Sequence, residues 1–347
     1  MGKPLFCPVI DMLEIPKQAS EFEGLIQQWS DGFRKIQLLR AAIELNLFEA
    51  LKNPKTADEV AAEFNGNHKL VKLMLECLVN TGLLVKRGDK YALSEISRTF
   101  LCADSQYSQI NFLKKHFSDL EMWQNLEKIV NEGPVRVDRA KFFSESVIHS
   151  MAQHSLLGEL QKTVEVISKY EEFTRARRLI DLGGGHGLYS VAFTKLNTKL
   201  KAVVFDLPEV VKRGKEYVER YRAERVEFVA GDFFKDDIGS GYDIVFSSYN
   251  PSGKNVGMID KIKKALKTGG IYVNKQYFWN DSKEIDLCDL EWNLWCFGEI
   301  EKNEKKYTFK KDLSLEEYIE ELVKRDFEIL DVVNFGEAKM IVARKKK

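Results

Sequence analysis

The sequence predicts an α/β fold, in which a parallel sheet covered by helices on both faces follows a mostly helical region. From residue 177 onward, short apolar strands alternate with helical segments, which is the pattern of strands joined by crossover helices. Before residue 170, apolar residues recur at the spacing of helices instead. A chain of 347 residues has room for two domains of ordinary size.

The first hundred residues carry signals for three helices and a hairpin. Apolar residues at helical spacing mark the segment 36–51, and Thr56 with Glu59 has the pattern of a capping box at the start of the next helix. Gly82 follows a third helix as a natural C-cap residue. The stretches LLVK and YAL flank the turn RGDK as a short hairpin. Together these elements predict a winged helix.

A winged helix can read DNA or can serve as a packing and dimerisation module. Residues 1–100 contain thirteen Lys and Arg against thirteen Asp and Glu, and the whole chain has 53 of each, for a formal net charge of zero. A DNA-reading helix needs basic side chains for phosphate contacts, and the same holds for anionic membranes. We therefore expect a dimerisation module that binds neither nucleic acid nor membrane. The apolar face of residues 36–51 also exceeds what three helices bury alone, which favours a partner subunit.

The cysteines and the apolar runs bear on location. Five scattered cysteines without a C-x-x-C pair predict neither a structural zinc site nor a disulfide framework, and they fit a reducing cytoplasm. No run reaches the ~18 apolar residues that span a bilayer, and the first residues lack the pattern of a secretory signal. We expect a cytoplasmic protein.

The segment from about 105 to 170 is predicted to be helical and contains His149 and His154. A lone histidine on a mixed helix is most often structural or exposed, and that is our first interpretation of both. Phe142, Phe143 and Met151 could form core or the wall of a pocket, and the sequence leaves both interpretations open.

Three polar motifs follow consecutive strands of the predicted sheet. The strand RRLI ends in Asp181-Leu-Gly-Gly-Gly-His-Gly187, whose glycines permit close approach of a ligand to the backbone. Asp206 ends the next strand, 25 residues after Asp181, where a carboxylate can accept both hydroxyls of a ribose. Asp232 and Phe233 follow the third strand and suit an adenine amino group and ring. Each motif alone could be a turn, but three at successive strand ends predict a ligand site.

The motifs DLGGGHG, FDLP and AGDFF resemble those of class I S-adenosylmethionine-dependent methyltransferases. With its winged-helix front end, the chain resembles the small-molecule O-methyltransferase family, which includes caffeic-acid and hydroxyindole types. The resemblance implies a Rossmann-like methyltransferase sheet preceded by a mostly helical winged-helix domain, S-adenosylmethionine as cofactor, no metal, and a homodimer formed through the N-terminal domain. The cofactor-binding residues it implies are Asp181, Gly183, Gly184, Gly185, Asp206, Leu207, Asp232, Phe233 and Ser248.

The same resemblance divides the chain into three parts. Residues 1–104 would form the winged-helix dimerisation domain, which closes part of the neighbour's substrate pocket. Residues 105–170 would form a helical linker that contributes to the pocket, and residues 171–347 the domain that binds S-adenosylmethionine.

The loop SSYNPSGKN, residues 247–255, departs from the family pattern. In plant-type members a catalytic histidine follows the fourth strand, nine residues after the strand's aspartate. Counting from Asp243 reaches Ser252, and the acidic neighbour of the usual histidine falls on Gly253. The histidine that would take the proton from a hydroxyl acceptor is therefore missing at its expected place.

Several explanations of this departure stay open. The acceptor could be a thiolate, an amine, a carbon nucleophile or an acidic phenol that needs no dedicated base. Another residue could act instead, and the candidates are His154, Asn250 and Ser252, with His149 also near in sequence. Asn250-Pro251 resembles part of the N-P-P-Y loop of amino-group methyltransferases. Finally, the protein could bind the cofactor without turnover, as a regulator.

Trp292 and Trp295 stand three residues apart on a predicted helix after the fifth strand. They could be core, but in the family the matching region lines the acceptor pocket, which favours a flat aromatic or polycyclic acceptor. We therefore expect methyl transfer from S-adenosylmethionine to a small aromatic molecule. The candidate substrate-binding residues are Phe143, His149, Met151, Trp292 and Trp295.

Overall fold

The computed structural model describes residues 15–138, 142, 147–279, 284–298 and 300–346. The chain divides into two compact units, one up to residue 110 and one from residue 111, and each is described by itself. No helix in the described part of the chain is long and apolar enough to cross a membrane.

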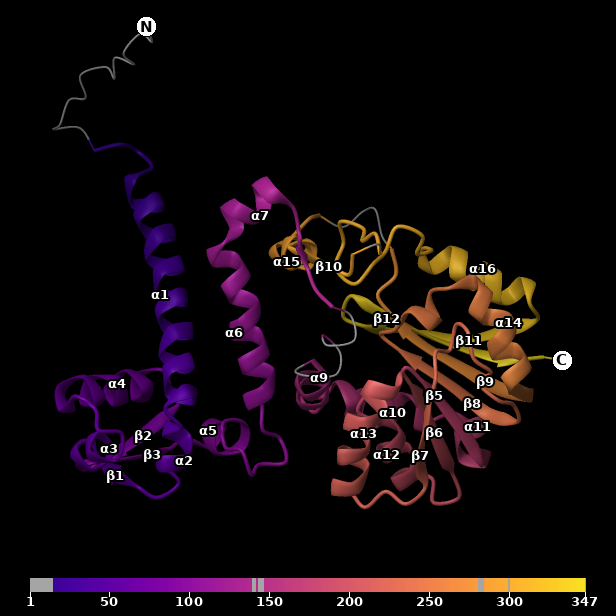
Figure 1. The fold of residues 1–347 in the computed structure, drawn as a ribbon, viewed down its shortest axis with the longest axis horizontal. Coiled ribbons are helices and arrows are strands. Elements are labelled where there is room, and N and C mark those ends of the chain that lie inside the picture. Colours follow the sequence, from indigo (N-terminus) through magenta and orange to yellow (C-terminus); the bar gives the residue numbers. More distant parts are fainter. Residues whose placement is uncertain (1–14, 139–141, 143–146, 280–283, 299, 347) are drawn as a thin grey trace, which may run out of the picture. The chain divides into compact units, whose positions relative to one another are not determined.

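The first unit contains the predicted helices and hairpin (Figure 1). Thr56 and Glu59 form the capping box in both directions, and Gly82 lies just after a helix with φ +78°. A two-residue strand, which the sequence did not reveal, pairs with the hairpin to give the order β1-β3-β2. The elements are α1 (Ala19–Glu44), α2 (Leu47–Ala50), β1 (Lys55–Thr56), α3 (Ala57–Glu63), α4 (His68–Asn80), β2 (Leu84–Arg87), β3 (Lys90–Leu93) and α5 (Glu95–Phe100).

Helix α1 exposes large apolar side chains along its first half. Phe22 is 66% exposed, Trp29 64% and Phe33 61%. Apolar side chains of this size, grouped on one helix, indicate a surface that another chain covers.

The second unit is built on a seven-stranded sheet of order β11-β12-β9-β8-β5-β6-β7. The pairs β9-β8, β8-β5, β5-β6 and β6-β7 are parallel, as predicted, while β11 and β12 add an antiparallel edge. The strands are β5 (Arg178–Leu182), β6 (Lys201–Asp206), β7 (Val226–Ala230), β8 (Tyr242–Ser248), β9 (Leu266–Gln276), β11 (Phe327–Phe335) and β12 (Ala338–Lys345). A separate pair joins β4 (Val135–Arg136) and β10 (Trp295–Cys296).

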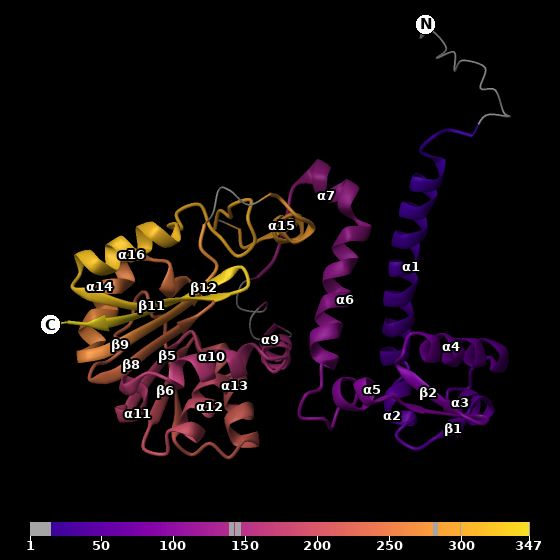
Figure 2. The same ribbon diagram turned by 180° about the vertical axis from the view of Figure 1, so that it is seen from behind.

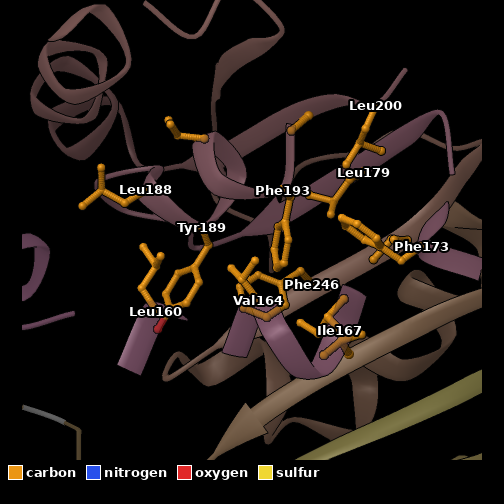
Figure 3. Packing of buried hydrophobic residues seen from close by; sticks show 14 of the residues in the cluster. Leu160, Val164, Ile167, Phe173, Leu179, Leu188, Tyr189, Phe193, Leu200 and Phe246 are labelled. Atoms are coloured by element: carbon orange, nitrogen blue, oxygen red, sulfur yellow. The ribbon is translucent and has the colours of Figure 1, made fainter. Parts of the chain in front are cut away.

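Helices cover both faces of this sheet, because successive residues of each buried strand point to opposite sides. Leu179 packs with α10, α11, α12 and α13 on one face, and its neighbour Ile180 packs with α14 and α16 on the other. Figure 3 shows the first of these cores, with Leu160 and Tyr189 next to the strand residue Phe246. The helices are α9 (Ile148–Ser155), α10 (Glu159–Ser168), α11 (Glu171–Arg175), α12 (Leu188–Leu196), α13 (Pro208–Arg220), α14 (Val256–Ala265) and α16 (Leu315–Lys324).

The remaining helices of this unit are α6 (Ile110–Gln124), α7 (Leu126–Glu132), α15 (Leu287–Asn293) and the short 3-10 helix η2 (Pro251–Gly253). The reverse view in Figure 2 shows α15 beyond the carboxyl ends of the central strands, on the same side as α9, and Figure 1 shows β10 next to α15. Since β5, β6, β8 and β9 run parallel, their carboxyl ends meet at one edge, and the loops that follow them form the candidate site.

Candidate active site

The glycine loop after β5 is folded tightly against its neighbours. A side-chain carbon on Gly183 would lie 3.0 Å from the amide of Asn250, and one on Gly184 would lie 2.5 Å from the carboxyl carbon of Asp181. On Gly185 it would meet nothing within 4 Å. The first two glycines are therefore required by close contacts within the protein, while Gly185 faces open space.

A glycine far along the chain completes this loop. Gly214, inside α13, faces the carbonyl oxygen of Gly185, and a side-chain carbon at position 214 would come within 2.4 Å of that oxygen. The helix that follows β6 can thus approach the glycine loop closely because residue 214 has no side chain.

Asp206, at the end of β6, joins two of the predicted strand-end motifs. Its carboxylate accepts hydrogen bonds from the backbone N–H of Gly185, at 2.8 Å, and of Leu207, also at 2.8 Å. These bonds fix the carboxylate beside the open side of the glycine loop, and the side chain is only partly buried. Such a fixed, accessible carboxylate can accept hydrogen bonds from ligand hydroxyls.

Asp181 and His186 lie inside the protein beneath this loop. Asp181 is 1% exposed and accepts a hydrogen bond from Ser190 at 2.9 Å. Burial raises the pKa of Asp181 to about 7, and burial lowers the pKa of His186 to about 4. His186 accepts a hydrogen bond from the backbone N–H of Leu188 at 3.1 Å, so it supports the turn into α12 as a neutral ring.

The third motif lies after β7. The carboxylate of Asp232 accepts a hydrogen bond from the N–H of Phe234 at 3.0 Å and pairs with Lys235 at 3.2 Å. Phe233 is 9% exposed and packs edge-on against Phe234, with a centroid separation of 4.7 Å. Lys261 donates to the carbonyl of Phe233 at 2.7 Å, which ties this turn to α14.

The loop after β8 is anchored by a set of uncharged side chains, which we call the neutral cluster: Ser247, Asn250, Ser252, Asn274 and Gln276. Asn250 caps η2, accepts from the N–H and hydroxyl of Ser252 at 3.0 and 2.5 Å, and donates to the carbonyl of Leu182 at 2.7 Å. Ser252 is 0% exposed, and its hydroxyl also bonds to that of Ser247 at 2.8 Å. Both predicted catalytic residues therefore hold the loop in place.

Gly253 shows why no acidic residue can follow Ser252. A side-chain carbon at position 253 would lie 2.0 Å from the Asn274 amide oxygen and 2.3 Å from the Gln276 amide nitrogen. Any residue larger than glycine at position 253 would therefore collide with the neutral cluster.

A charged cluster lies on the other face of the same strands and contains Glu159, Thr163, Tyr189, Tyr249 and Lys275. The side chain of Lys275 is completely buried, and its ammonium donates to Glu159 at 2.7 Å, Thr163 at 2.7 Å and Tyr189 at 2.9 Å. The hydroxyl of Tyr249, the first residue after β8, donates to the same oxygen of Glu159 at 2.7 Å. Burial lowers the pKa of Lys275 to about 8, against the opposing charge of Glu159.

Ser248 ends β8 between the two clusters. Its buried hydroxyl has no hydrogen-bond partner among the described residues. A nucleoside cofactor with an amino-acid tail fits this edge of the sheet, because it can use the fixed carboxylate of Asp206, the open space at Gly185 and the buried hydroxyl of Ser248. The predicted cofactor residues are thus brought to one edge, with Asp232 and Phe233 on the turn next to Asp206.

The two histidines of α9 have different surroundings. His149 hydrogen-bonds the Tyr217 hydroxyl at 2.8 Å, and burial lowers its pKa. His154 stacks on Phe112 with ring centroids 4.7 Å apart, and burial lowers its pKa as well, while the charge of Glu159 opposes this shift. Met151, on the same helix, is 44% exposed, and Phe143 lies outside the described residues.

A row of aromatic rings in contact, which we call the aromatic wall, leads away from Tyr249; Tyr249 stacks on Tyr277, and the later pairs are tilted or edge-on. Successive ring centroids lie 4.9 to 5.3 Å apart along the series Tyr249, Tyr277, Tyr307, Trp292 and Trp295. Trp292 lies on α15 as predicted, but the prediction of a helix is wrong for Trp295. The helix ends at Asn293, and Trp295 belongs to β10, which pairs with β4.

Lys302 closes the far end of this wall. Its ammonium lies 3.7 Å from the ring centroid of Trp292 and 3.1 Å from that of Trp295, and it donates to the backbone carbonyls of both. Burial lowers the pKa of Lys302 to about 7. Sequence reasoning did not identify Lys302, Lys275, Glu159 or Tyr249 as site residues. Each contacts a partner far away in the sequence or in another element, and no local sequence pattern marks such a contact.

The fold and the strand-end residues define a Rossmann-like methyltransferase of class I, and comparisons with known proteins agree. Residues 138–278 match the model of the O-methyltransferase domain, and residues 27–103 match that of the O-methyltransferase dimerisation domain. An uncharacterized protein of Methanocaldococcus jannaschii is 40% identical over 326 residues, which are 91% of this chain and 87% of that protein.

Relatives with a named activity are more distant. Acetylserotonin O-methyltransferase of Bos taurus is 28% identical, over 73% of this chain and 79% of that protein. The N,N-dimethyltransferase OxyT of Streptomyces rimosus is 27% identical, over 71% and 76%. The crystal structure of human N-acetylserotonin methyltransferase in complex with S-adenosylmethionine aligns with a TM-score of 0.66 and 23% identity, over 96% of this chain and all of that one. The chain belongs to the S-adenosylmethionine-dependent O-methyltransferase family, and its cofactor is S-adenosylmethionine.

Proposed function

We propose that the protein transfers a methyl group from S-adenosylmethionine to a small, flat aromatic acceptor. The aromatic wall carries this proposal, because it begins at Tyr249, directly after the strand that ends beside the glycine loop, and continues to Trp295. Aromatic side chains offer a flat apolar ligand both ring faces and ring edges to pack against. Buried Lys254 supports the wall by donating to the carbonyl of Tyr307 and pairing with Asp312 at 3.1 Å.

The strand-end residues have separate roles toward the cofactor in this proposal. Asp206 accepts the ribose hydroxyls, Asp232 and Phe233 face the adenine, and Ser248 and the glycine loop accommodate the remainder. The bound cofactor supplies an electrophilic methyl group, so the chain's main task is to align the acceptor with it. Alignment of this kind is worth several kcal/mol, up to roughly 7–11 in the best cases.

We leave the accepting atom open, because residues 247–255 contain no histidine at the place where the family resemblance leads us to expect one. The relatives point in two directions, since one is named for O-methylation and another for N,N-dimethylation. We infer further that the protein is a homodimer formed through the exposed face of α1, which overlaps the dimerisation-domain match. The described cysteines are free thiols, which supports a reducing, cytoplasmic location.

The test is methyl incorporation from labelled S-adenosylmethionine into a panel of phenols, aromatic thiols and aromatic amines. We expect at least one aromatic class to be methylated, and Asp206→Ala to abolish both methylation and S-adenosylhomocysteine binding in calorimetry. Methylation confined to aliphatic acceptors would contradict the proposal. Cofactor binding without turnover on any class would indicate a binding protein instead.

A further inference from the structure

Tyr249 has an unusual backbone for a residue with a large side chain. Its φ is +54°, in the left-handed region, where a non-glycine residue is strained by about 1 kcal/mol or more. This conformation occurs at the point where β8 ends and the candidate site begins. With this conformation the Tyr249 ring lies on the face of the sheet that carries the charged cluster. The next residue, Asn250, belongs to the neutral cluster on the other face.

Two interactions hold the Tyr249 side chain in this position. The ring stacks on Tyr277 at 5.2 Å, and the hydroxyl donates to Glu159 at 2.7 Å. The Lys275 ammonium lies 4.7 Å from the Tyr249 ring centroid and donates to the same Glu159 oxygen. A phenol that donates its own proton can still accept a hydrogen bond through its oxygen lone pairs. The Tyr249 oxygen is therefore prepared to accept from a donor at the start of the aromatic wall.

Glu159 connects this position to solvent. Its side chain is 30% exposed and lines a hollow of about 430 Å³ between α10 and the end of β11, whose other walls include Lys162, Val333 and Phe335. Lys275 keeps Glu159 ionised, because its charge and hydrogen bond oppose the effect of burial and leave the pKa of Glu159 below its ordinary value. A proton that reaches Glu159 can therefore be released into this hollow.

We propose that Tyr249 and Glu159 form a proton relay that takes the proton of the methyl acceptor and delivers it to solvent. This inference rests on the proposed function. Transfer of a methyl group from a sulfonium to an O–H or N–H acceptor leaves a neutral thioether and releases one proton. The acceptor hydrogen-bonds to the Tyr249 oxygen and gives it this proton as the new bond forms. Tyr249 simultaneously gives its own proton to Glu159, so no tyrosinate forms, and Glu159 then loses the proton to water.

The other titratable groups near the relay are less suited to this role. Lys275 is enclosed by its three hydrogen-bond partners, and the Asp181 carboxyl is buried beneath the glycine loop. Tyr189 accepts a hydrogen bond from Lys275. His154, the remaining candidate, is stacked on Phe112 and affects Glu159 only through its charge. Within the described part of the chain, Tyr249 is the titratable residue that joins the strand end, the aromatic wall and an ionised carboxylate.

The test titrates 4-nitrophenol bound to the complex with S-adenosylhomocysteine, followed by the absorbance of the phenolate. The wild type is compared with Tyr249→Phe, Glu159→Gln and the double variant. Tyr170→Phe is the matched control, because it removes another tyrosine-to-carboxylate hydrogen bond, to Asp331 at 3.1 Å, before the start of β5. Circular dichroism and binding of S-adenosylhomocysteine verify that each variant is folded.

We expect bound 4-nitrophenol to ionise at a lower pH than free 4-nitrophenol in the wild type and in Tyr170→Phe. Tyr249→Phe should reverse this shift by about one pH unit, because it removes a hydrogen-bond donor to the phenolate, while Glu159→Gln should favour the phenolate further, because it removes a neighbouring negative charge. The relay itself is measured by the rates of transfer, where the double variant should add little to either single variant, since both residues act on one path. Methyl transfer to phenol should fall on the order of 10²-fold in each relay variant, and transfer to the more acidic 4-nitrophenol should fall much less.

The outcomes separate the two proposals. Saturable binding of 4-nitrophenol together with an unchanged rate of methyl transfer to phenol in both relay variants would overturn the relay and leave the aromatic acceptor site standing. Failure of 4-nitrophenol to bind the wild type in a saturable way would overturn both. Loss of folding in Tyr249→Phe would leave Glu159→Gln, which keeps the shape of the side chain, to decide.

Discussion

The carboxyl ends of β8 and β9 carry two polar clusters that differ in charge and in construction. The neutral cluster consists of uncharged side chains that hydrogen-bond one another or, in the case of Asn274, the backbone of the loop. The charged cluster joins β9 to α10, across 116 residues of sequence, through a buried lysine and a partly exposed glutamate. One cluster fixes the shape of the loop after β8, and the other places ionisable groups at the same strand ends. We therefore assign loop geometry to the first and proton chemistry to the second.

The largest expected effect comes from removing the buried charge. Lys275→Met should lower the free energy of unfolding by about 3 kcal/mol, because it leaves Glu159 without its cation in a partly buried place. In a protein that already carries Glu159→Gln, Lys275→Met should lower the free energy of unfolding by a smaller amount, with a difference of about 1 kcal/mol or more. Denaturant titration of the four proteins gives this difference. Equal costs in both backgrounds would show that the ion pair is not what stabilises the charged cluster.

A smaller effect should appear in the pH dependence of stability. It comes from the buried Asp181 carboxyl, which ionises, whereas no member of the neutral cluster does. Asp181 has a folded pKa of about 7, above its unfolded value. Its contribution to stability is complete below pH ~4 and is lost as the pH rises through about 7. The unfolding free energy of the wild type should therefore fall relative to Asp181→Asn as the pH rises over this range. His186 has the opposite slope, because its folded pKa is lowered to about 4, but this slope is common to both proteins.

Denaturant titrations from pH 4 to pH 8 measure this difference directly. A constant offset between wild type and Asp181→Asn would contradict it. The same comparison made with a variant of the neutral cluster should give a constant offset, since no member of that cluster ionises.

The smallest expected effect concerns Ser252. Ser252→Ala removes one buried hydroxyl between Ser247 and Asn250, and it should cost about 1–2 kcal/mol of stability because both partners lose a hydrogen bond. Methyl transfer at saturating acceptor should change less than threefold. A loss of 10²-fold in kcat with unchanged stability would instead identify Ser252 as catalytic and reverse the assignment of the two clusters.

Sequence reasoning reached the fold and the cofactor edge because their signals are local. Alternating strands and helices, the capping box at Thr56, and acidic residues that directly follow strands can all be read within a few positions. The loop at residue 250 carried such a signal as well, since Asn followed by Pro is the pattern of a cap at the start of a helical turn. The cap accounts for the hydrogen bonds that Asn250 makes to Ser252, and a catalytic role for either residue stays a prediction.

The charged cluster could not be predicted from local sequence patterns. Lys275 looks like an ordinary polar end of a strand, and Glu159 like an ordinary residue at the start of a helix. Their proximity depends on how α10 packs across β9, and a single sequence contains no local trace of that packing. The left-handed backbone of Tyr249 is likewise imposed by tertiary contacts, because tyrosine has no intrinsic preference for it.

The contact between Gly214 and the carbonyl of Gly185 has a consequence for how relatives of this protein are recognised. The motif at residues 181–187 is normally treated as one continuous sequence signature. Here its shape also depends on a residue some thirty positions later, in the middle of a helix where glycine is otherwise costly. A signature for this loop should therefore have two separate parts. A homologue that keeps the first and carries a larger residue at position 214 should be suspected of a displaced loop.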